Sequence, residues 1–336
     1  MITASPSARL SSPVADWREL WRDAITDAGE LLQAVGLGGR TDLLPVDDAG
    51  FALRVPRGFV ARMRRHDPRD PLLLQVLPQQ AEHDRAEGFG VDAVGDMDAR
   101  AGHGILHKYD GRALLIASGS CAVNCRYCFR RHFPYSEEIA AAAQWRDALA
   151  HLRADPSIRE LILSGGDPLA LATHKLEELS RGLADLPQVI RLRIHTRLPV
   201  VLPERVDAPL AAWLRELPLQ KVVVLHANHA NELDASVDAA CARLRDAGVS
   251  LLNQSVLLRG INDSADALAA LSERLFAAGV LPYYLHQLDR VQGTAHFEVS
   301  DARALALVDA VRARLPGYLV PKLVREVRGE PSKRAL

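Results

Sequence analysis

Three of the chain's four cysteines lie within eight residues, at Cys121, Cys125 and Cys128. The spacing C-x3-C-x2-C brings three thiolates within reach of one centre, and thiolates favour zinc, copper(I) and iron–sulfur clusters. A closed structural zinc site needs four ligands, and His132 could supply the fourth. A [4Fe–4S] cluster with only three cysteine ligands leaves one iron open for another molecule. The cysteine spacing alone leaves both an iron–sulfur cluster and a zinc ion as alternatives.

The fourth cysteine, Cys241, is not expected to join this group. It lies in a segment where Val237, Ala240, Cys241 and Leu244 recur at helical spacing. A lone cysteine on such an apolar stripe is most often a small core residue. We therefore predict that the Cys241 thiol faces the hydrophobic core.

Short apolar strands alternate with longer amphipathic helices from residue 111 onward. Alternating β and α units predict a parallel sheet with helices outside it, and six or seven units suit a barrel or part of one. The predicted fold is α/β, a partial (β/α)6-type barrel with a mostly helical N-terminal region. Strands are expected at 112–118, 158–168, 189–199, 221–229, 250–260, 281–289 and 318–327. Helices are expected at 136–153, 173–186, 235–247, 264–278 and 300–315.

The N-terminal region, 1–105, lacks this alternation and is predicted to be separate from the catalytic domain at 106–336. Apolar residues recur at roughly helical spacing over 14–36, which predicts a helix there. A stretch rich in glycine and aspartate, 87–104, is expected to be a connector between the two parts.

Polar residues fall where the predicted strands end, which is where barrels of this kind place their active sites. Glycines at a strand end also allow close backbone approach to a ligand. These strand-end residues are Gly165, Gly166, Asp167, His195, Arg197, His226, His229, Arg259 and Asp289.

The composition excludes several classes of protein. The 41 basic and 42 acidic residues nearly cancel, which argues against a general binder of nucleic acid or acidic membranes. No apolar run approaches the ~20 residues of a membrane-spanning helix, and the first residues lack the apolar core of a secretion signal. We therefore expect a cytoplasmic protein, in a compartment where thiols stay reduced.

Several ordered segments together resemble the lysine 2,3-aminomutase family of radical S-adenosylmethionine (SAM) enzymes. "CAVNCRYC" has the CxxxCxxC signature of radical SAM enzymes in general. The narrower resemblance rests on "HKYDGRALL", "CRYCFRRHF", "LILSGGDPL", "LPVVLPERV", "NQSVLLRGIND" and "PYYLHQLD…G…HF", and covers about residues 105–336. The ending "VPKLVREVRGEPSKRAL" is similar to the branch that supplies β-lysine for modification of translation elongation factor P.

The resemblance implies three cofactors. Cys121, Cys125 and Cys128 would hold a [4Fe–4S] cluster whose open iron binds SAM. Pyridoxal 5′-phosphate (PLP) would be bound covalently by Lys333, in "GEPSKRAL". The residues matching the SAM site are Gly165, Gly166, Asp167, His226 and Gln254. The residues matching the PLP site, besides the lysine, are Lys108, Tyr109 and Arg112.

The resemblance also implies how a substrate would be held. Arg130 matches the arginine that binds the substrate carboxylate, for which a guanidinium fork is well suited. Asp289 and Glu326 match two acids that hold the distal ammonium of lysine. Two acids favour lysine over glutamate, because they would repel a distal carboxylate.

The expected function is therefore that of an isomerase, converting L-lysine to β-lysine with an external electron donor. The product is expected to pass to a lysyl ligase and on to elongation factor P. Two alternatives remain open on the sequence: an aminomutase that makes free β-lysine for catabolism or natural products, and a non-catalytic protein that binds an iron–sulfur cluster or zinc.

Overall fold

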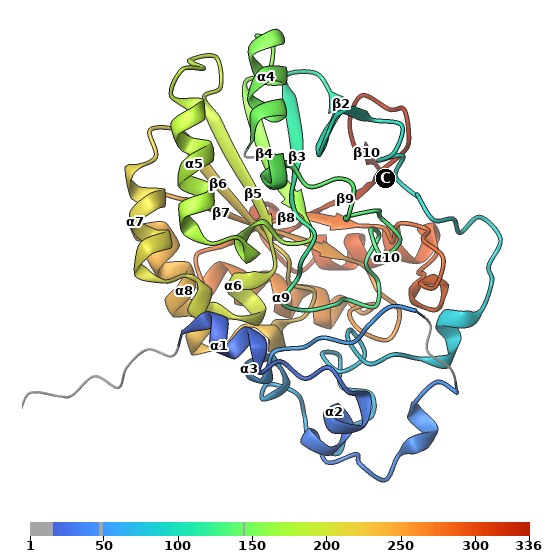
Figure 1. Ribbon diagram of the computed structural model, residues 1–336. Coiled ribbons are helices and arrows are strands. Elements are labelled where there is room, and N and C mark those ends of the chain that lie inside the picture. Colours follow the sequence, from blue (N-terminus) through green and yellow to red (C-terminus); the bar gives the residue numbers. More distant parts are fainter. Residues whose placement is uncertain (1–15, 47–49, 144) are drawn as a thin grey trace, which may run out of the picture.

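The strands of the sheet pair in the order in which they occur along the chain (Figure 1). The computed structural model describes residues 16–46, 50–143 and 145–336. Within these residues the strands are β1 (Arg100–Gly102), β2 (Ile105–Tyr109), β3 (Arg112–Ser118), β4 (Glu160–Gly165), β5 (Arg191–Thr196), β6 (Gln220–Leu225), β7 (Ser250–Val256), β8 (Leu281–His286), β9 (Lys322–Arg325) and β10 (Arg334–Ala335).

The strands β3 to β9 are parallel, and antiparallel strands extend the sheet at both ends. In the described part of the chain, β1 pairs only with β2 and β10 only with β9. The sheet is therefore an open, partial barrel, which confirms the predicted fold class.

Helices cover the outside of the curved sheet (Figure 1). A representative is α9, whose N-cap Ser264 accepts a hydrogen bond from the Ala267 N–H and whose Leu268, Leu271 and Leu275 are buried. None of the described helices has the length and apolar character needed to cross a membrane. The helices are α1 (Trp17–Arg22), α2 (Ala28–Ala34), α3 (Arg57–Val60), α4 (Arg146–Ala154), α5 (Thr173–Leu183), α6 (Leu198–Val201), α7 (Ala208–Glu216), α8 (Ala235–Asp246), α9 (Ala265–Ala277) and α10 (Asp301–Arg312).

The seven predicted strands correspond to β3 through β9, and the five predicted helices to α4, α5, α8, α9 and α10. The helix predicted at 136–153 is too long at its start, because α4 begins only at Arg146 and a short 3-10 turn, Ala140–Ala143, precedes it. The strand at 112–118 has its predicted bounds, whereas the others are shorter because their predicted ranges included residues of the adjoining loops. The antiparallel strands β1, β2 and β10 and the helices α6 and α7 were not predicted. Each of these strands has at most five residues, too few to show a reliable period.

The prediction of one helix over 14–36 is wrong. Two helices, α1 and α2, occur there instead, because Ile25 leaves the helical path and pairs with Val55 in an isolated β-bridge. Asp27 then caps the second helix by accepting from the Glu30 N–H. Residues 14 and 15 lie outside the described residues. With α3 only four residues long, the described part of this region is less helical than predicted.

The region up to residue 105 packs against the barrel. Trp17, Leu31 and Phe59 belong to the same hydrophobic cluster as Leu163 of β4 and Leu225 of β6. The expected connector, 87–104, contributes β1 to the sheet. The division of the chain at residue 105 stays a prediction, and one core extends across it.

Candidate active site

A cavity of about 1230 Å³ opens at the carboxyl ends of the parallel strands. Its walls come from the loop after β3, the ends of β4 to β8 and the C-terminal segment. This volume is ample for several small ligands. Each residue that the sequence predicts for a cluster, SAM, PLP or substrate lines this cavity. The sequence thus identifies residues that are far apart along the chain but line the same cavity.

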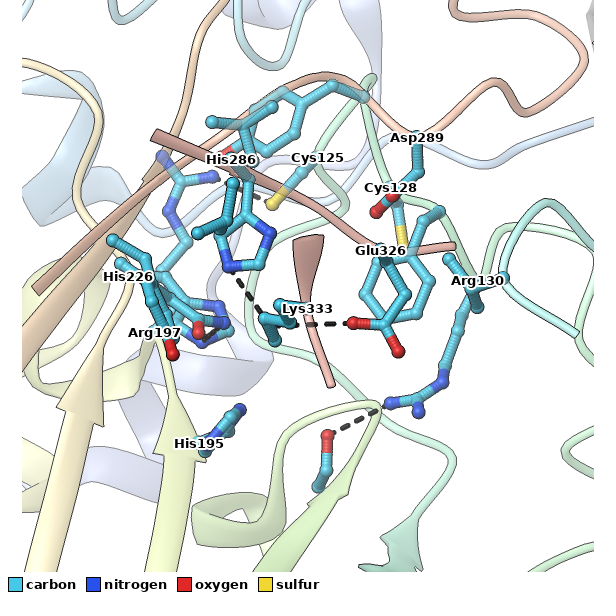
Figure 2. Close-up of a pocket in the computed structure, with 18 of the residues that line it drawn as sticks. Cys125, Cys128, Arg130, His195, Arg197, His226, His286, Asp289, Glu326 and Lys333 are labelled. Atoms are coloured by element: carbon cyan, nitrogen blue, oxygen red, sulfur yellow. Dashed lines mark hydrogen bonds and ion pairs between the residues drawn. The ribbon is translucent and has the colours of Figure 1, made fainter. Parts of the chain in front are cut away.

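Cys121, Cys125 and Cys128 are free, half-buried thiols on the loop after β3. Cys125 and Cys128 are labelled in Figure 2. Burial raises the pKa of Cys121 well above its usual value and that of Cys128 to about 11. A metal centre would deprotonate such thiols on binding. In the described part of the chain, no three His, Cys, Asp or Glu side chains are close enough to ligate a single ion. In a [4Fe–4S] cluster each thiolate binds a different iron, so three soft sulfur donors on one loop fit that group.

The two other candidate ligands lie elsewhere. The His132 side chain is exposed, its ring nitrogen contacts the Gln292 carbonyl at 3.2 Å, and it does not line the cavity. Cys241 is buried in α8 beside Val237, Ala240 and Leu244, as predicted. The structure therefore does not place His132 as a fourth ligand beside the three thiols.

A buried acid holds the cysteine loop. Glu82 accepts hydrogen bonds from Nε of Arg126 at 2.8 Å and from Nη2 of Arg131 at 2.8 Å. All three side chains are almost fully buried. The Arg126 N–H also donates to the Gln75 carbonyl, so the N-terminal region fixes the backbone between Cys125 and Cys128.

Gly165 and Gly166 make close contacts with the cysteine loop. The Gly166 N–H donates to the Ser118 carbonyl at 2.7 Å, and the Asp167 N–H donates to the Ser120 carbonyl at 2.9 Å. A Cβ on Gly166 would lie 2.7 Å from the Ser120 carbonyl oxygen, and Gly165 has φ +112°. The predicted close approach therefore includes the protein's own backbone, and both glycines also face the cavity.

The Asp167 carboxylate joins the ends of β4 and β5. It accepts from the Thr196 hydroxyl at 2.7 Å and from the N–H groups of Leu169, Arg197 and Leu198. Burial raises its pKa to about 6 despite these donors. With its oxygens used internally, the side chain has a structural role here, and its predicted contact with SAM stays a prediction.

His226 and Gln254 lie side by side on β6 and β7, with the Gln254 amide 2.9 Å from Nε2 of His226. Burial lowers the pKa of His226 to about 3, so the ring is neutral. The ring of His195 packs edge-on against the ring of His226, with 5.9 Å between the ring centroids (Figure 2). These side chains give the cavity floor a neutral, hydrogen-bonding character.

Lys333 points into the cavity although it is only three residues before Leu336 (Figure 2). Its Nζ lies 3.1 Å from Nε2 of His286, 3.8 Å from Glu326 and 5.3 Å from the Tyr284 ring centroid. Burial lowers its pKa, which favours a neutral amine. The antiparallel pairing of β10 with β9 holds the segment in place. A desolvated lysine of this kind fits covalent attachment of PLP.

In Figure 2 the two predicted substrate acids both lie to the right of this lysine. Glu326 accepts a hydrogen bond from the Tyr109 hydroxyl and lies 3.8 Å from Lys108. Asp289 lines the cavity, and its pKa is raised to about 7, first by burial and then by Glu326, with Lys333 opposing the shift. Both acids interact electrostatically with Nζ of Lys333.

The basic residues face these acids from the other wall. Arg112 lies over the Tyr109 ring at 4.7 Å. Arg130 is buried and donates from Nη1 to the Ser164 hydroxyl at 2.9 Å and from Nε to Asp96 at 2.6 Å. Lys108 also contacts Asp96, at 2.6 Å. The cavity thus has a cationic side at Lys108, Arg112 and Arg130.

Sequence reasoning missed two residues at this site and assigned no role to a third. Asp96 lies in the irregular stretch that was expected to be a connector. His286 is the last residue of β8, and although it lies within the segment "PYYLHQLD", sequence reasoning assigned it no role. Arg197 was noted only as a strand-end residue, and it donates to Cys125 and Glu232. By contrast, His229 caps a short helical turn and Arg259 is exposed, and neither lines the cavity.

Comparisons with known proteins agree with this geometry. The family model described as the Radical SAM superfamily matches residues 115–271. The L-lysine 2,3-aminomutase of Escherichia coli (strain K12) is 50% identical over 96% of this chain and 94% of its own length. That of Haemophilus influenzae is 46% identical over 95% and 94%. That of Clostridium subterminale is 31% identical over 95% of this chain and 77% of the relative.

Enzymes of this family use a [4Fe–4S] cluster, SAM and PLP, and are isomerases. The thiols at one wall of the cavity and the desolvated lysine within it are the protein groups that such cofactors require. The similarity extends over nearly the whole chain rather than over the cysteine motif alone. The chain belongs to the lysine 2,3-aminomutase family of radical SAM enzymes.

Proposed function

We propose that this chain moves the α-amino group of L-lysine to the β-carbon and so produces β-lysine. The observation that supports this best is that Lys333, the acids Asp289 and Glu326 and the guanidinium of Arg130 line the same cavity as the three thiols. The relatives named L-lysine 2,3-aminomutase support the same reaction.

When bound, the cluster and SAM supply a carbon radical that removes hydrogen, and PLP supplies the delocalisation that lets nitrogen migrate. Cys121, Cys125 and Cys128 hold the cluster in this proposal. The proposed SAM site is lined by Gly165, Gly166, His226 and Gln254. Asp167 supports this site through its hydrogen bonds to the residues that follow β5. The ring of His226 and the amide of Gln254 are neutral hydrogen-bonding groups. They suit SAM, which carries both positive and negative groups in the same molecule.

The chain's residues fix the two ends of lysine. Arg130 binds the α-carboxylate through its guanidinium fork. Asp289 and Glu326 bind the distal ammonium, in place of the Lys333 amine that contacts Glu326 at 3.8 Å in this structure. With both ends held, the β-carbon has one orientation in the cavity, which is how pre-organised binding contributes to the rate.

Lys333 holds PLP covalently in this proposal, and Lys108, Tyr109 and Arg112 hold its phosphate end. Burial lowers the pKa of Lys333, which favours the neutral, nucleophilic form of the amine. His286 accepts a hydrogen bond from Nζ at 3.1 Å and orients it.

We further propose that the β-lysine passes to a lysyl ligase and on to elongation factor P, and that the reaction takes place in the cytoplasm with an external electron donor. The ending "VPKLVREVRGEPSKRAL", which is similar to the branch that supplies β-lysine for elongation factor P, supports this destination. Deletion of the gene should remove the corresponding mass increment from elongation factor P.

The test of the reaction uses anaerobically reconstituted protein with SAM, PLP, a reductant and L-lysine, followed by chiral analysis for β-lysine. Product that requires both SAM and PLP is the expected result. Reductive SAM cleavage without β-lysine would mean another substrate. Bound zinc with neither reaction would mean a metal-binding protein and would contradict the proposal.

Matched lysine variants test the assignment of Lys333. Lys333→Ala should lose the PLP that borohydride reduction fixes to the chain, as detected by peptide mass. The control is Lys175→Ala on α5, where the lysine pairs with Glu178 and does not line the cavity. This variant should retain the fixed PLP. PLP fixed to any other lysine would show that the assignment is wrong.

A further inference from the structure

We propose that Asp96 is a positioning residue shared by two anion sites, the PLP phosphate site at Lys108 and the substrate carboxylate site at Arg130. This inference rests on the proposed function, which assigns those two cations to those two anions. Asp96 itself is not expected to touch either ligand. It acts by fixing the two basic side chains relative to one another.

The first step of the argument is the geometry of the Asp96 carboxylate. Its Oδ1 lies 2.6 Å from Nζ of Lys108, and its Oδ2 lies 2.6 Å from Nε of Arg130. One carboxylate therefore bridges two cations that come from different elements, β2 and the cysteine loop. Its side chain is only 2% exposed, so water screens neither contact appreciably.

The second step is its charge. Burial alone would raise the pKa of Asp96, but the charges of Arg130 and Lys108 outweigh that effect and hold the pKa below its usual value. Asp96 is therefore ionised at neutral pH. One negative charge shared by two positive ones leaves a net positive charge on the trio, so both cations still attract anions.

The third step is which atoms stay available. Arg130 uses Nε for Asp96 and Nη1 for Ser164, and neither contact uses Nη2. Lys108 donates to the Val94 carbonyl at 2.8 Å as well as contacting Asp96, and an ammonium has three donors. Each cation is thus tethered on one side and keeps donor capacity for the cavity.

The fourth step is what holds Asp96 itself. The Asp92 carboxylate accepts from the backbone N–H of Asp96 at 2.9 Å and of Met97 at 3.1 Å. The adjacent Gly95 has φ +68°, and a Cβ there would lie 2.7 Å from Cγ of Arg328. The turn is therefore fixed by its own hydrogen bonds and by tight packing. A fixed acid is what a positioning role requires.

The experiment compares the full-length wild type with Asp96→Asn, Asp96→Glu and Glu138→Gln. Glu138 is the matched control: it is buried and bound to Arg100 and to the Gly104 N–H nearby, but it does not line the cavity. PLP affinity is measured by spectroscopic titration of cofactor-free protein. KM and kcat for L-lysine are measured on cluster-loaded protein.

Asp96→Asn should weaken PLP binding and raise the KM for L-lysine, each roughly tenfold, because both charge-assisted contacts become neutral ones. The change in kcat should be smaller. Asp96→Glu should recover part of both losses, and Glu138→Gln should leave both values near those of the wild type. If Asp96→Asn does not fold, Asp92→Asn should show a smaller loss in the same two values.

Two results would overturn the proposal. If a folded Asp96 or Asp92 variant has the PLP affinity and the KM of the wild type, Asp96 contributes to the fold and does not position Lys108 and Arg130. Tighter binding of PLP or lysine by Asp96→Asn would show that the carboxylate competes with the ligand anions. If the wild type binds PLP but forms no β-lysine, the proposed function fails, and the PLP titration still decides whether Asp96 positions Lys108.

Discussion

Nη1 of Arg197 donates a hydrogen bond to Sγ of Cys125 across 2.7 Å. The same guanidinium donates from Nη2 to Gln75 at 2.6 Å and to Glu232 at 3.0 Å. Arg197 follows β5, so this side chain links a strand end, the N-terminal region and the cysteine loop. The position of one thiol therefore depends on a charge network buried behind it.

Removing this arginine should affect both stability and cluster loading. Arg197→Met leaves Glu232 buried without its cation, which should lower the free energy of unfolding by about 3–5 kcal/mol. Bound iron and sulfide should fall as well. Arg259→Met is the control, since Arg259 also follows a strand but is exposed, and its effect should stay within about 0.5 kcal/mol. Equal effects of the two variants would refute a role for the network.

The cysteines differ in what their loss should do. Cys128→Ala should abolish stable binding of the reconstituted cluster, measured as iron and sulfide per chain. Cys241→Ala should keep the cluster and cost about 1 kcal/mol of stability, because it only removes a sulfur atom from the α8 core. Cluster loss in Cys241→Ala without unfolding would mean that the ligand set is wrong.

Gly166→Ala should destabilise the protein by about 1–3 kcal/mol, since the new methyl group would overlap the Ser120 carbonyl. The cysteine loop would have to shift, so reconstituted iron content should fall in parallel. Gly317→Ala is the matched control, because an added Cβ meets no atom within 4 Å there. Thermal unfolding of the two cofactor-free variants measures the difference, and identical midpoints would contradict the packing argument.

Asp289 should make stability depend on pH. Its folded pKa of about 7 lies above the usual aspartate value, so between these two values the folded chain binds more protons than the unfolded chain. The contribution of this group is therefore stabilising at low pH and is lost as pH rises from about 4 to about 7.

The comparison of wild type with Asp289→Asn isolates this effect. The difference in unfolding midpoint should change in favour of the variant as the pH rises from about 5 to about 8. Thermal melts of cofactor-free protein at several pH values give that difference directly. Parallel pH profiles for the two proteins would show that Asp289 titrates normally.

The parallel strands were the most predictable part of the fold. A strand such as β4 is buried along Leu161, Ile162 and Leu163, so it reads as an apolar run. The strands β1, β2 and β10 are short, and β1 and β10 are exposed, so none of the three forms a long apolar run. The break between α1 and α2 could not be predicted either, because Val55 decides where Ile25 lies.

The site residues separate in a similar way. Cys121, Cys125, Cys128 and Lys333 could be named because motifs single them out. Asp96 and His286 could not, because their importance lies in which side chains they meet after folding. Asp96 comes from a stretch without periodicity, and only the folded chain brings it to Arg130.

The bond from Tyr109 to Glu326 joins the second and ninth strands of a sheet whose edges are not paired with each other in the described residues. The Lys108–Glu326 ion pair spans the same gap. A ligand that contacts residues on both sides of this gap would therefore link the two ends of the open sheet and restrict their relative motion. Amide hydrogens of β2 and β9 would then exchange with solvent more slowly in the loaded protein, so the rigidity of the barrel would itself report whether the cavity is filled.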